Sequence, residues 1–325
     1  MGRMAYKNNI FRGFLFLAVL FSALASFLPE IDHSIMLLEL LSQYRFHLAV
    51  LWVLLLLVLA FGRHYLLMSV QLIIVIFHGV IFFSSYSFFE GERACKAVDE
   101  VSVLSFNVYH LNERYDQMLR GILQADADIV LLLEHKSGFY HHNHARLSVK
   151  YPFSHVDLDG GVAQGKAIYS KYPITSVSRE NMAGASRIAI KAEINKNGQA
   201  IDFIGVHTAS PQSAARIAGR NSQLLSLEHY MRRLPLLERP VIVAGDFNNT
   251  PWHPRMRHFK HHLGLKNNDK LSEVFGTWPS WLPFFARLPI DHIYHGAKLQ
   301  NIEYNRSVAA GSDHYSIHSI MKICE

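Results

Sequence analysis

Hydrophobic positions are concentrated at the start of the chain, where three long runs contain no charged residue. The runs are 17, 17 and 26 residues long. They lie between Arg12 and Glu30, between Arg45 and Arg63, and between Arg63 and Glu90. About 20 apolar residues, with a range of roughly 17–25, cross a bilayer as a helix. The pattern therefore predicts three transmembrane helices, at about residues 13–29, 46–62 and 65–85.

The first run also has features of a cleavable signal. It follows a basic stretch (Arg3, Lys7 and Arg12) and contains an Ala-Leu-Ala sequence at 23–25, which resembles a signal-peptidase site. Cleavage is therefore an alternative for this run. The second and third runs would then still form a membrane hairpin.

Basic residues around the runs predict the orientation of the anchor. Three precede the first run, and Arg63 lies in the short link between the second and third. The segment from Glu30 to Arg45, expected to be a loop, holds three acidic residues against the single Arg45. The positive-inside rule then places the N-terminus and the short link in the cytoplasm. We expect residues 1–90 to form a multi-pass anchor and residues 91–325 to lie outside the cytoplasm.

Beyond residue 98, short β-rich runs alternate with stretches of helical spacing. Residues 112–125 and 213–234 carry apolar side chains every third or fourth position, which is typical of amphipathic helices. The expected strands are VSVLSFNVYH, DIVLLLEH, GKAIYSKYPI, RIAIKAEI, AIDFIGVHT, PVIVAGDFN, IDHIYH and YSIHSIMKI. The alternation predicts one α/β domain after the anchor.

Polar residues suited to chemistry fall at the ends of these expected strands. They are Asn107, Glu134, His207, Asp246, Asn248, Asp291, His292, Asp313 and His314. Any one of them could be a cap or a turn former, but loops at strand ends of a rigid scaffold are where sites are usually built. Six strand ends that each offer an Asn, Asp, Glu or His therefore predict a single site.

The chemistry of this set favours hydrolysis at phosphorus. The chain has no GxSxG or P-loop motif. Oxygen donors favour Mg²⁺, Mn²⁺ or Ca²⁺ over Zn²⁺, and Mg²⁺ needs only one or two carboxylates because waters and substrate phosphate complete its shell. Adjacent carboxylate, amide and imidazole groups can orient a water and stabilise charge on a phosphoryl group. Metal-assisted phosphoester hydrolysis is the reaction class that fits this set of strand-end residues best.

Charge and cysteine content add two weaker constraints. Residues 91–325 carry 32 − 5 = 27 basic and 26 − 4 = 22 acidic residues, a net charge of +5. This mild excess suits an anionic substrate or a lipid surface and is too small to indicate nucleic acid by itself. Cys95 and Cys324 are the only cysteines. Outside the cytoplasm they could form one disulfide, whereas two free thiols are the alternative.

The motifs also resemble a known family. LSFNVYHLN, DIVLLLEH, GKAIYSKYPI, GVHTASP, VAGDFNNTPW, PIDHIYH and GSDHYSIH occur in the order typical of the endonuclease/exonuclease/phosphatase superfamily, over roughly residues 100–323. That superfamily includes deoxyribonucleases, abasic-site endonucleases, sphingomyelinases and inositol polyphosphate phosphatases. With its apolar N-terminus and its TWP at 277–279, the chain resembles the bacterial membrane-anchored branch. The resemblance implies a bacterial cytoplasmic (inner) membrane as the location.

The resemblance implies an α/β fold with a four-layer sandwich of two mostly antiparallel β-sheets flanked by helices, and a role for each motif residue. Asn107 and Glu134 would hold Mg²⁺, with Mn²⁺ as an alternative, and Asp313 would hold metal-bound water. The catalytic set implied is Asp246 to activate water, Asn248 and His207 to contact the phosphate or leaving group, His314 to bind the phosphoryl oxygen, and Asp291 to orient His314.

The resemblance also bears on the two cysteines. First and last strands are antiparallel neighbours in this family, and a register that pairs position 107 with 314 pairs position 97 with Cys324. Cys95 lies two residues from that position. A disulfide requires Cα atoms within about 7 Å. The resemblance therefore implies a Cys95–Cys324 disulfide.

Several residues depart from the family pattern or stay outside it. Leu133 and Gly205 stand where many relatives have Gln and Asn. Solvated or packing roles are expected for Lys166, Tyr169, Arg187, Arg216 and Arg220. The histidine-rich stretches 141–144 and 257–262 are expected to be solvated loops, with binding of Zn²⁺ or Cu²⁺ as an alternative for the first.

The combined prediction is a membrane-anchored, divalent-metal-dependent phosphoester hydrolase, a phosphodiesterase or phosphatase, that acts outside the cytoplasm. A membrane anchor slightly favours a phospholipid or lipid-linked phosphate. The alternatives are a membrane-anchored nuclease and a catalytically silent binding or assembly protein on the same fold. The lipid bilayer is an expected partner, and no obligate protein partner is inferred.

Overall fold

The computed structural model describes residues 2–86, 95–158, 164–182, 188–267 and 276–325. By its internal contacts the chain divides into two units. The first contains Met1–Ser85 together with Trp252–Pro254, and the second contains Tyr86–Pro251 and Arg255–Glu325.

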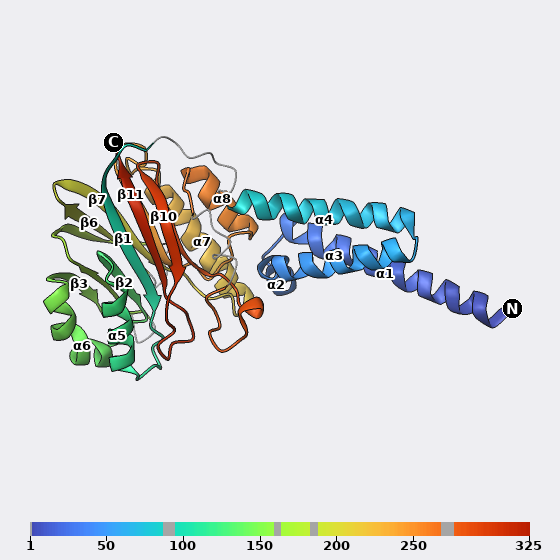
Figure 1. The fold of residues 1–325 in the computed structure, drawn as a ribbon, viewed down its shortest axis with the longest axis horizontal. Coiled ribbons are helices and arrows are strands. Elements are labelled where there is room, and N and C mark those ends of the chain that lie inside the picture. The colour runs from blue at the N-terminus through green and yellow to red at the C-terminus, as the bar shows by residue number, and fades with distance from the viewer. Residues whose placement is uncertain (1, 87–94, 159–163, 183–187, 268–275) are drawn as a thin grey trace. The chain divides into compact units, whose positions relative to one another are not determined.

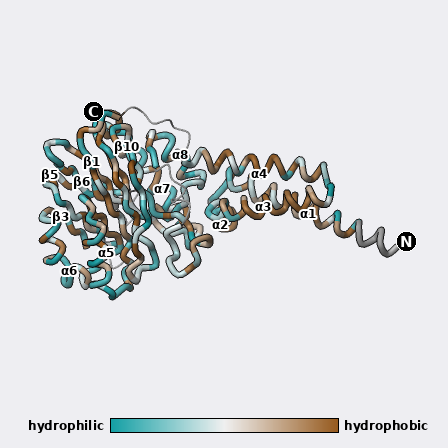
Figure 2. Tube along the Cα trace, in the orientation of Figure 1, coloured by the Kyte–Doolittle hydropathy of each residue, from teal (hydrophilic) through white to brown (hydrophobic). Residues whose placement is uncertain are grey.

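The first unit is helical. It consists of α1 (Gly2–Ile31), α2 (Met36–Gln43), α3 (Arg45–Phe61) and α4 (Tyr65–Ser85). Hydrophobic residues extend along α1, α3 and α4 (Figure 2). By length and composition, Asn9–Ile31 and Tyr65–Ser85 could each cross a membrane. α2 and α3 taken together are also long and apolar enough, although the chain bends by 75° between them. Two or three spans are thus compatible with the structure, and the orientation stays a prediction.

The segment between the first two apolar runs was expected to be a loop, and this expectation is wrong for Met36–Gln43, which forms α2. Glu39 and Gln43 are one helical turn apart, and the Gln43 amide donates to Oε1 of Glu39 at 2.6 Å. Both side chains are buried. This contact satisfies polar groups that would otherwise disfavour a buried helix.

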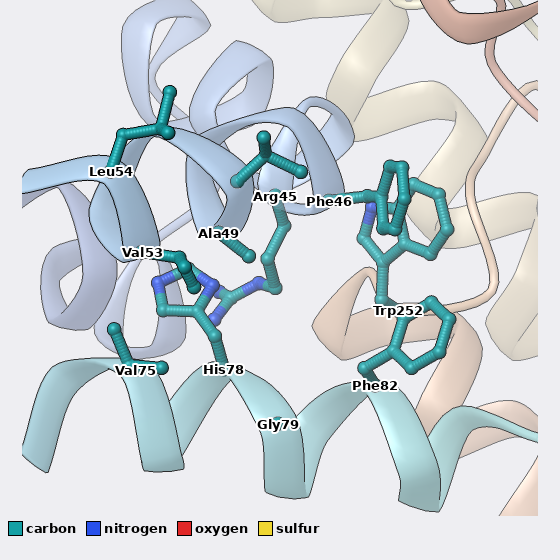
Figure 3. Close-up of a pocket in the computed structure, with 11 residues that line it drawn as sticks. Arg45, Phe46, Ala49, Val53, Leu54, Val75, His78, Gly79, Phe82 and Trp252 are labelled. Carbon is teal, nitrogen blue, oxygen red and sulfur yellow. The ribbon is translucent and has the colours of Figure 1, made fainter. Parts of the chain in front are cut away.

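A cavity of about 340 Å³ lies within the helical unit (Figure 3). Most of its lining is apolar and comes from α3 and α4, and Trp252 also contributes. Arg45 and His78 are its charged and titratable members. Arg45 forms an ion pair with Glu30 at 2.6 Å, and the His78 ring lies 2.8 Å from the Ser26 hydroxyl. These polar side chains therefore make contacts between helices.

The second unit contains two β-sheets (Figure 1). The first has the strand order β10-β11-β1-β2-β4-β3, and the second β5-β6-β7-β8-β9. Only the pairs β1–β2 and β7–β8 are parallel among the described strands. The strands are β1 (Ala97–Asn107), β2 (Ile129–Leu133), β3 (Phe153–Asp157), β4 (Lys166–Ser170), β5 (Ile174–Asn181), β6 (Ile188–Lys196), β7 (Gln199–His207), β8 (Val241–Asp246), β9 (Asp291–His295), β10 (Leu299–Arg306) and β11 (Ile317–Cys324).

Alternation of side chains along the strands builds three hydrophobic layers. Val103 packs between the two sheets, whereas its neighbour Leu104 packs under the helices α5 (Tyr115–Ala125) and α6 (Ser137–Lys150). The helices α7 (Ala214–Met231) and α8 (Pro254–Leu263) cover the outer face of the other sheet. Successive strand residues point to opposite faces, so the central strands are buried on both sides, whereas β5 and β10 at the edges are partly exposed. The predicted four-layer α/β sandwich of mostly antiparallel sheets is confirmed.

The two histidine-rich stretches were expected to be solvated loops, and both expectations are wrong. Residues 141–144 lie in α6, and residues 257–262 lie in α8. Each helix buries only a narrow stripe of side chains. In α6 the buried positions are Phe139, Asn143 and Leu147, and in α8 they are Met256, Phe259 and Leu263. Such spacing places the three side chains on one face of a helix.

The predicted disulfide between Cys95 and Cys324 is present, with Cα atoms 5.2 Å apart. β1 and β11 are antiparallel neighbours, and Ala97 pairs with Cys324 across them. The bridge therefore joins the start of the first strand to the end of the last.

Candidate active site

The sheet topology brings the predicted site residues together. In the first sheet, Asn107 at the end of β1 pairs with Leu133 at the end of the parallel strand β2. Glu134 is the residue that follows Leu133. In the second, Asp246 is flanked by His207 on one side and by Asp291 on the other. The Asn107 amide donates to Oδ2 of Asp246 at 3.2 Å and so connects the two sheets. One end of the sandwich therefore carries the polar cluster.

Glu134 is held at the centre of this cluster. Its backbone has φ +55°, in the left-handed region, which turns the chain sharply at the end of β2. Oε1 of Glu134 accepts from the Asn107 amide at 3.2 Å, and Oε2 accepts from the backbone N–H of His110 at 3.1 Å and contacts the His110 ring. Both oxygens of the carboxylate are thus positioned by β1 and the loop after it.

Asp246 follows a glycine that the geometry requires. Gly245 has φ +142°, and a Cβ there would lie 1.9 Å from the carbonyl oxygen of Val206. The close approach of β7 and β8 at this point sets the position of Asp246. Oδ1 of Asp246 accepts from the backbone N–H of Asn248 at 2.8 Å, and Asn248 has φ +49°. The turn therefore aims the carboxylate toward the other sheet.

The surroundings of Asp246 favour its protonated form. The side chain is buried, with 1% exposure. Burial and then the charge of Asp291 raise its pKa to about 7, against the opposing effects of His314 and of hydrogen bonds from Asn248 and Asn107. A carboxyl group with such a pKa can accept a proton near neutral pH, as a general base must.

His314 lies between two carboxylates. Nδ1 lies 2.8 Å from Oδ2 of Asp291, and Nε2 lies 3.8 Å from Oδ2 of Asp246. Burial alone would lower the pKa of His314, but the neighbouring carboxylates, with Asp291 first, raise it to about 10. The ring is therefore an imidazolium at neutral pH, able to stabilise negative charge.

His207 and Asn248 complete the wall formed by the second sheet. Nε2 of His207 lies 3.8 Å from Oε1 of Glu134 and 3.7 Å from Oδ2 of Asp246. The Asn248 amide donates to the carbonyl of Thr208 at 3.0 Å. Buried Arg220 donates to the carbonyl of Asn248 at 3.1 Å, so α7 supports this turn. This contact agrees with the packing role expected for Arg220.

Asp313 lies beside Trp278, and one of its oxygens is buried without a hydrogen bond among the described residues. Oδ2 accepts from the indole N–H of Trp278 at 3.2 Å. Among the described residues, Oδ1 accepts no hydrogen bond. Burial raises the pKa of Asp313, and the charges of Glu134 and Asp291 add to this effect, whereas His314 and Trp278 oppose it.

The donor set fits a divalent cation. The Asn107 amide donates to the carboxylates of both Glu134 and Asp246, and the charge of Glu134 acts on Asp313. Oδ1 of Asp313 is buried without a hydrogen bond among the described residues. The Asn107 amide oxygen accepts from the backbone N–H of Tyr109 at 3.1 Å, and an amide oxygen has a second lone pair that a cation can use. Oxygen donors of this kind suit Mg²⁺ or Mn²⁺.

A different grouping, Asp246 with Asp291 and His314, has ligand atoms within 4.8 Å of one another. Nδ1 of His314 already contacts Asp291 at 2.8 Å. This charged hydrogen bond accounts for the short distances without a metal. The assignment of Asn107, Glu134 and Asp313 as the cation ligands stays a prediction.

Sequence patterns did not reveal three supporting residues. His110 contacts Glu134, and the Thr277 hydroxyl donates to Oδ2 of Asp291 at 2.5 Å. The Ser312 hydroxyl donates to the Asn107 carbonyl at 2.7 Å and accepts from the backbone N–H of His314 at 3.0 Å. Thr277 and Ser312 belong to motifs that were recognised, but their partners lie far away in the sequence. Only the fold shows these contacts.

The remaining basic and aromatic candidates make local contacts. Lys166 is buried and donates to the Gln164 carbonyl at 3.1 Å, while the Tyr169 hydroxyl lies 3.0 Å from the His144 ring. Arg216 donates to Ser210. Arg187 lies outside the described residues.

The two departures from the family pattern have physical reasons. Leu133 belongs to the hydrophobic layer between the sheets. A Cβ at Gly205 would lie 2.7 Å from Cδ1 of Leu131, a side chain of the opposite sheet. A larger residue at position 205 would therefore require the Leu131 side chain to shift.

Comparison with known proteins agrees with this architecture. The structure is similar to an endonuclease/exonuclease/phosphatase from Beutenbergia cavernae, with a TM-score of 0.56 and 14% identity over 69% of this chain and 72% of that one. It is also similar to the human Nocturnin catalytic domain with bound sulfate, with a TM-score of 0.56 and 17% identity over 69% of this chain and 94% of that one. A third similar structure is SmcL, with a TM-score of 0.55 and 17% identity over 69% of this chain and 99% of that one. These low identities show the fold alone.

Sequence comparison goes further. No curated protein sequence matches the chain. The sequence model of the endonuclease/exonuclease/phosphatase family, however, matches residues 104–314, which include the strand ends that form the site. The chain therefore belongs to the endonuclease/exonuclease/phosphatase family.

Proposed function

We propose that this chain is a membrane-anchored, divalent-metal-dependent phosphoester hydrolase that acts outside the cytoplasm. The observation that carries the proposal is the buried arrangement of Asp246, His314 and Asp291. It combines a carboxylate that can take a proton near pH 7 with an imidazolium that keeps its proton. Membership of the family supports the same reaction class.

Each side chain has a role that follows from its surroundings. Asp246 accepts a proton from the attacking water, and His314 donates a hydrogen bond to a phosphoryl oxygen as negative charge develops there. Asp291 keeps the His314 ring oriented and protonated. His207 and Asn248 lie beside Asp246 and contact the phosphate or the leaving oxygen.

Asn107, Glu134 and Asp313 would hold the cation, Mg²⁺ or alternatively Mn²⁺. When bound, such a cation neutralises phosphate charge and lowers the cost of placing an anionic ester among these carboxylates. Oδ1 of Asp313, which is buried without a hydrogen bond among the described residues, supports this assignment, because a cation would compensate its burial.

Exposed aromatic residues beside the site favour a lipid-linked substrate. The turn 277–288, here called the aromatic loop, exposes Trp281, Phe284 and Phe285 by 70%, 51% and 62%. The loop is fixed to the site because the Ser280 backbone N–H donates to the Asp313 carbonyl at 2.7 Å. Exposed apolar clusters of this kind commonly mark membrane or ligand contacts. A phospholipid or lipid-linked phosphoester is therefore the proposed substrate class.

A nuclease is the second candidate within the same reaction class. Nonspecific binding of nucleic acid needs a basic groove with stacking aromatics. The net charge of +5 on residues 91–325 is small for that purpose. The non-enzyme alternative is a binding or assembly protein. Such a protein would not need both Asp246 and His314 at the site, so the presence of the pair favours an enzyme.

The test uses the full chain in detergent micelles. Hydrolysis of an aryl phosphodiester and of the matching monoester is measured with Mg²⁺, with Mn²⁺ and with EDTA, followed by phospholipid in mixed micelles and single-stranded DNA. Metal-dependent turnover with preference for the lipid is expected. Preference for DNA would establish the nuclease, and absence of turnover on every substrate by a folded, metal-binding protein would favour the binding protein.

A further inference from the structure

Two helices of the second unit bring together a carboxylate and two imidazoles outside the active site. Glu228 lies on α7, and His258 and His262 lie on α8. Oε1 of Glu228 lies 3.1 Å from Nδ1 of His262, and Oε2 lies 3.5 Å from Nε2 of His258. One ligand atom from each residue lies within 4.8 Å of the others.

The packing of α7 against α8 explains why Glu228 lies close to His258 and His262. His258 and His262 are four residues apart, so they occupy the same side of α8. The apolar side of α8 packs with Leu224, Leu227 and Met231 of α7 over the sheet. The histidine side is therefore left partly in solvent, next to α7, with side chains that are 42% and 38% exposed.

Glu228 is the unusual member of the group. Its side chain is 3% exposed, although a carboxylate is costly to bury without compensation. Within the described part of the chain, its Oε2 accepts no hydrogen bond. A buried carboxylate oxygen that makes no hydrogen bond and lies 3.5 Å from a histidine ring is an observation independent of the sequence spacing of the histidines. A cation at this position would remove the desolvation cost.

We propose that Glu228, His258 and His262 bind a divalent transition metal of the Zn²⁺ type. Two imidazoles and one carboxylate are the ligand types that Zn²⁺ accepts, and three protein ligands leave one position for water. Mg²⁺ is a poor fit because it prefers oxygen ligands. The site differs from the catalytic cluster in both its residues and its preferred metal.

The metal would act as a clamp between α7 and α8. α8 follows the turn that carries Asn248, and α7 supplies Arg220, which donates to the Asn248 carbonyl. Joining the two helices therefore stabilises the support of this turn. Binding to the folded state alone raises the free energy of unfolding in proportion to the logarithm of metal concentration over Kd.

Two arginines neighbour this cluster: Arg255, whose charge acts on Glu228 and His258, and Arg232, which contacts the cluster directly and competes with the metal. Nη2 of Arg232 lies 3.4 Å from Oε1 of Glu228 and 3.0 Å from Nδ1 of His262. The Arg232 side chain is 51% exposed, so it can move into solvent when a metal binds. Removal of this guanidinium should therefore strengthen metal binding.

The experiment titrates the full chain in detergent with Zn²⁺ and, separately, with Co²⁺. The protein is first stripped with EDTA, and excess Mg²⁺ is present throughout to occupy the oxygen-rich site. We expect one Zn²⁺ per chain, visible Co²⁺ absorption typical of nitrogen and oxygen ligands, and a rise in the unfolding temperature. His258→Ala and His262→Ala should each weaken binding on the order of 100-fold, since loss of a supporting contact alone costs 10- to 100-fold.

Two further variants keep the result unambiguous. His261→Ala, an exposed histidine on the same helix, should bind as the unchanged protein does. Arg232→Gln should bind more tightly. Circular dichroism checks that every variant is folded. Equal Zn²⁺ binding by the unchanged protein and the His258→Ala/His262→Ala double variant, or equal loss in His261→Ala, would overturn the proposal.

Discussion

Nδ1 of His314 lies 2.8 Å from Oδ2 of Asp291, and Nε2 of the same ring lies 3.8 Å from Oδ2 of Asp246. The imidazole of His314 thus lies between Asp291, which orients the ring, and Asp246, which is proposed to activate the attacking water. Because all three side chains are buried, their charges interact strongly. Several expected outcomes follow from this arrangement.

Replacing Asp291 with Asn should lower kcat by about 10- to 100-fold and leave KM nearly unchanged, because Asp291 acts through His314 and does not touch the substrate. Asp291 is also the leading cause of the raised pKa of His314, so the alkaline limb of the pH profile should move to lower pH. Thr277→Val, which removes only one hydrogen bond to Asp291, should have a smaller effect. An unchanged alkaline limb in Asp291→Asn would contradict this account.

The pH profile of the unchanged enzyme should be bell-shaped. Asp246 must be deprotonated, and its pKa of about 7 without metal means that activity falls as the pH drops through that region. His314 must be protonated, and its pKa of about 10 means that activity falls above that value. A bound cation favours the ionised carboxylate, so the acid limb should move to lower pH as Mg²⁺ increases. Measurement of kcat/KM against pH at two Mg²⁺ concentrations tests this shift, and an acid limb independent of Mg²⁺ would argue against a cation near Asp246.

The aromatic loop should matter for lipid and not for small substrates. Trp281→Ser combined with Phe285→Ser should lower turnover of phospholipid in mixed micelles at least several-fold, because apolar area removed from water contributes roughly 25 cal/mol per Å². Hydrolysis of a soluble aryl phosphodiester should stay the same. Leu237→Ser is a matched control, since Leu237 is 76% exposed and lies outside the loop. Equal losses on both substrates would mean that the loop supports folding of the site.

Orientation in the membrane can be tested by reporter fusion. Alkaline phosphatase is active only outside the bacterial cytoplasm, where its disulfides form. A fusion after Glu325 should be active, and a fusion at Gly62 in the short link should be inactive. The reverse pattern would place the catalytic unit in the cytoplasm and would be hard to reconcile with the Cys95–Cys324 disulfide.

The sequence predicted much of the site because the local signals were strong. Asp246 follows a continuous apolar run, and Gly245 before it marks a close approach of two strands. The order of the motifs then predicted which strand ends would meet. The structure brings Asn107, Glu134, His207 and Asp246 together, while their individual roles stay predictions.

The parts that were missed depend on contacts between distant residues. α6 and α8 are rich in histidine and bury only three side chains each, one of which in α6 is the polar Asn143, so the helical pattern was weak. β3 and β10 lie at the two edges of one sheet, where one side of the strand has no neighbour and the hydrophobic pattern is diluted. Glu228 and His258 are 30 residues apart, and only the packing of α7 on α8 reveals their contact.

The most direct test of the proposed function compares Asp246→Asn with Asp202→Asn in the full chain. Asp202 is also buried, but it lies at the other end of β7 and forms an ion pair with Lys191 at 2.9 Å. Hydrolysis of an aryl phosphodiester is measured with Mg²⁺ and with EDTA. Asp246→Asn should lose about 10²- to 10⁴-fold in kcat, the usual contribution of a general base, whereas Asp202→Asn should keep Mg²⁺-dependent turnover. Turnover by Asp246→Asn equal to that of the unchanged protein, or turnover that EDTA does not abolish, would contradict the account.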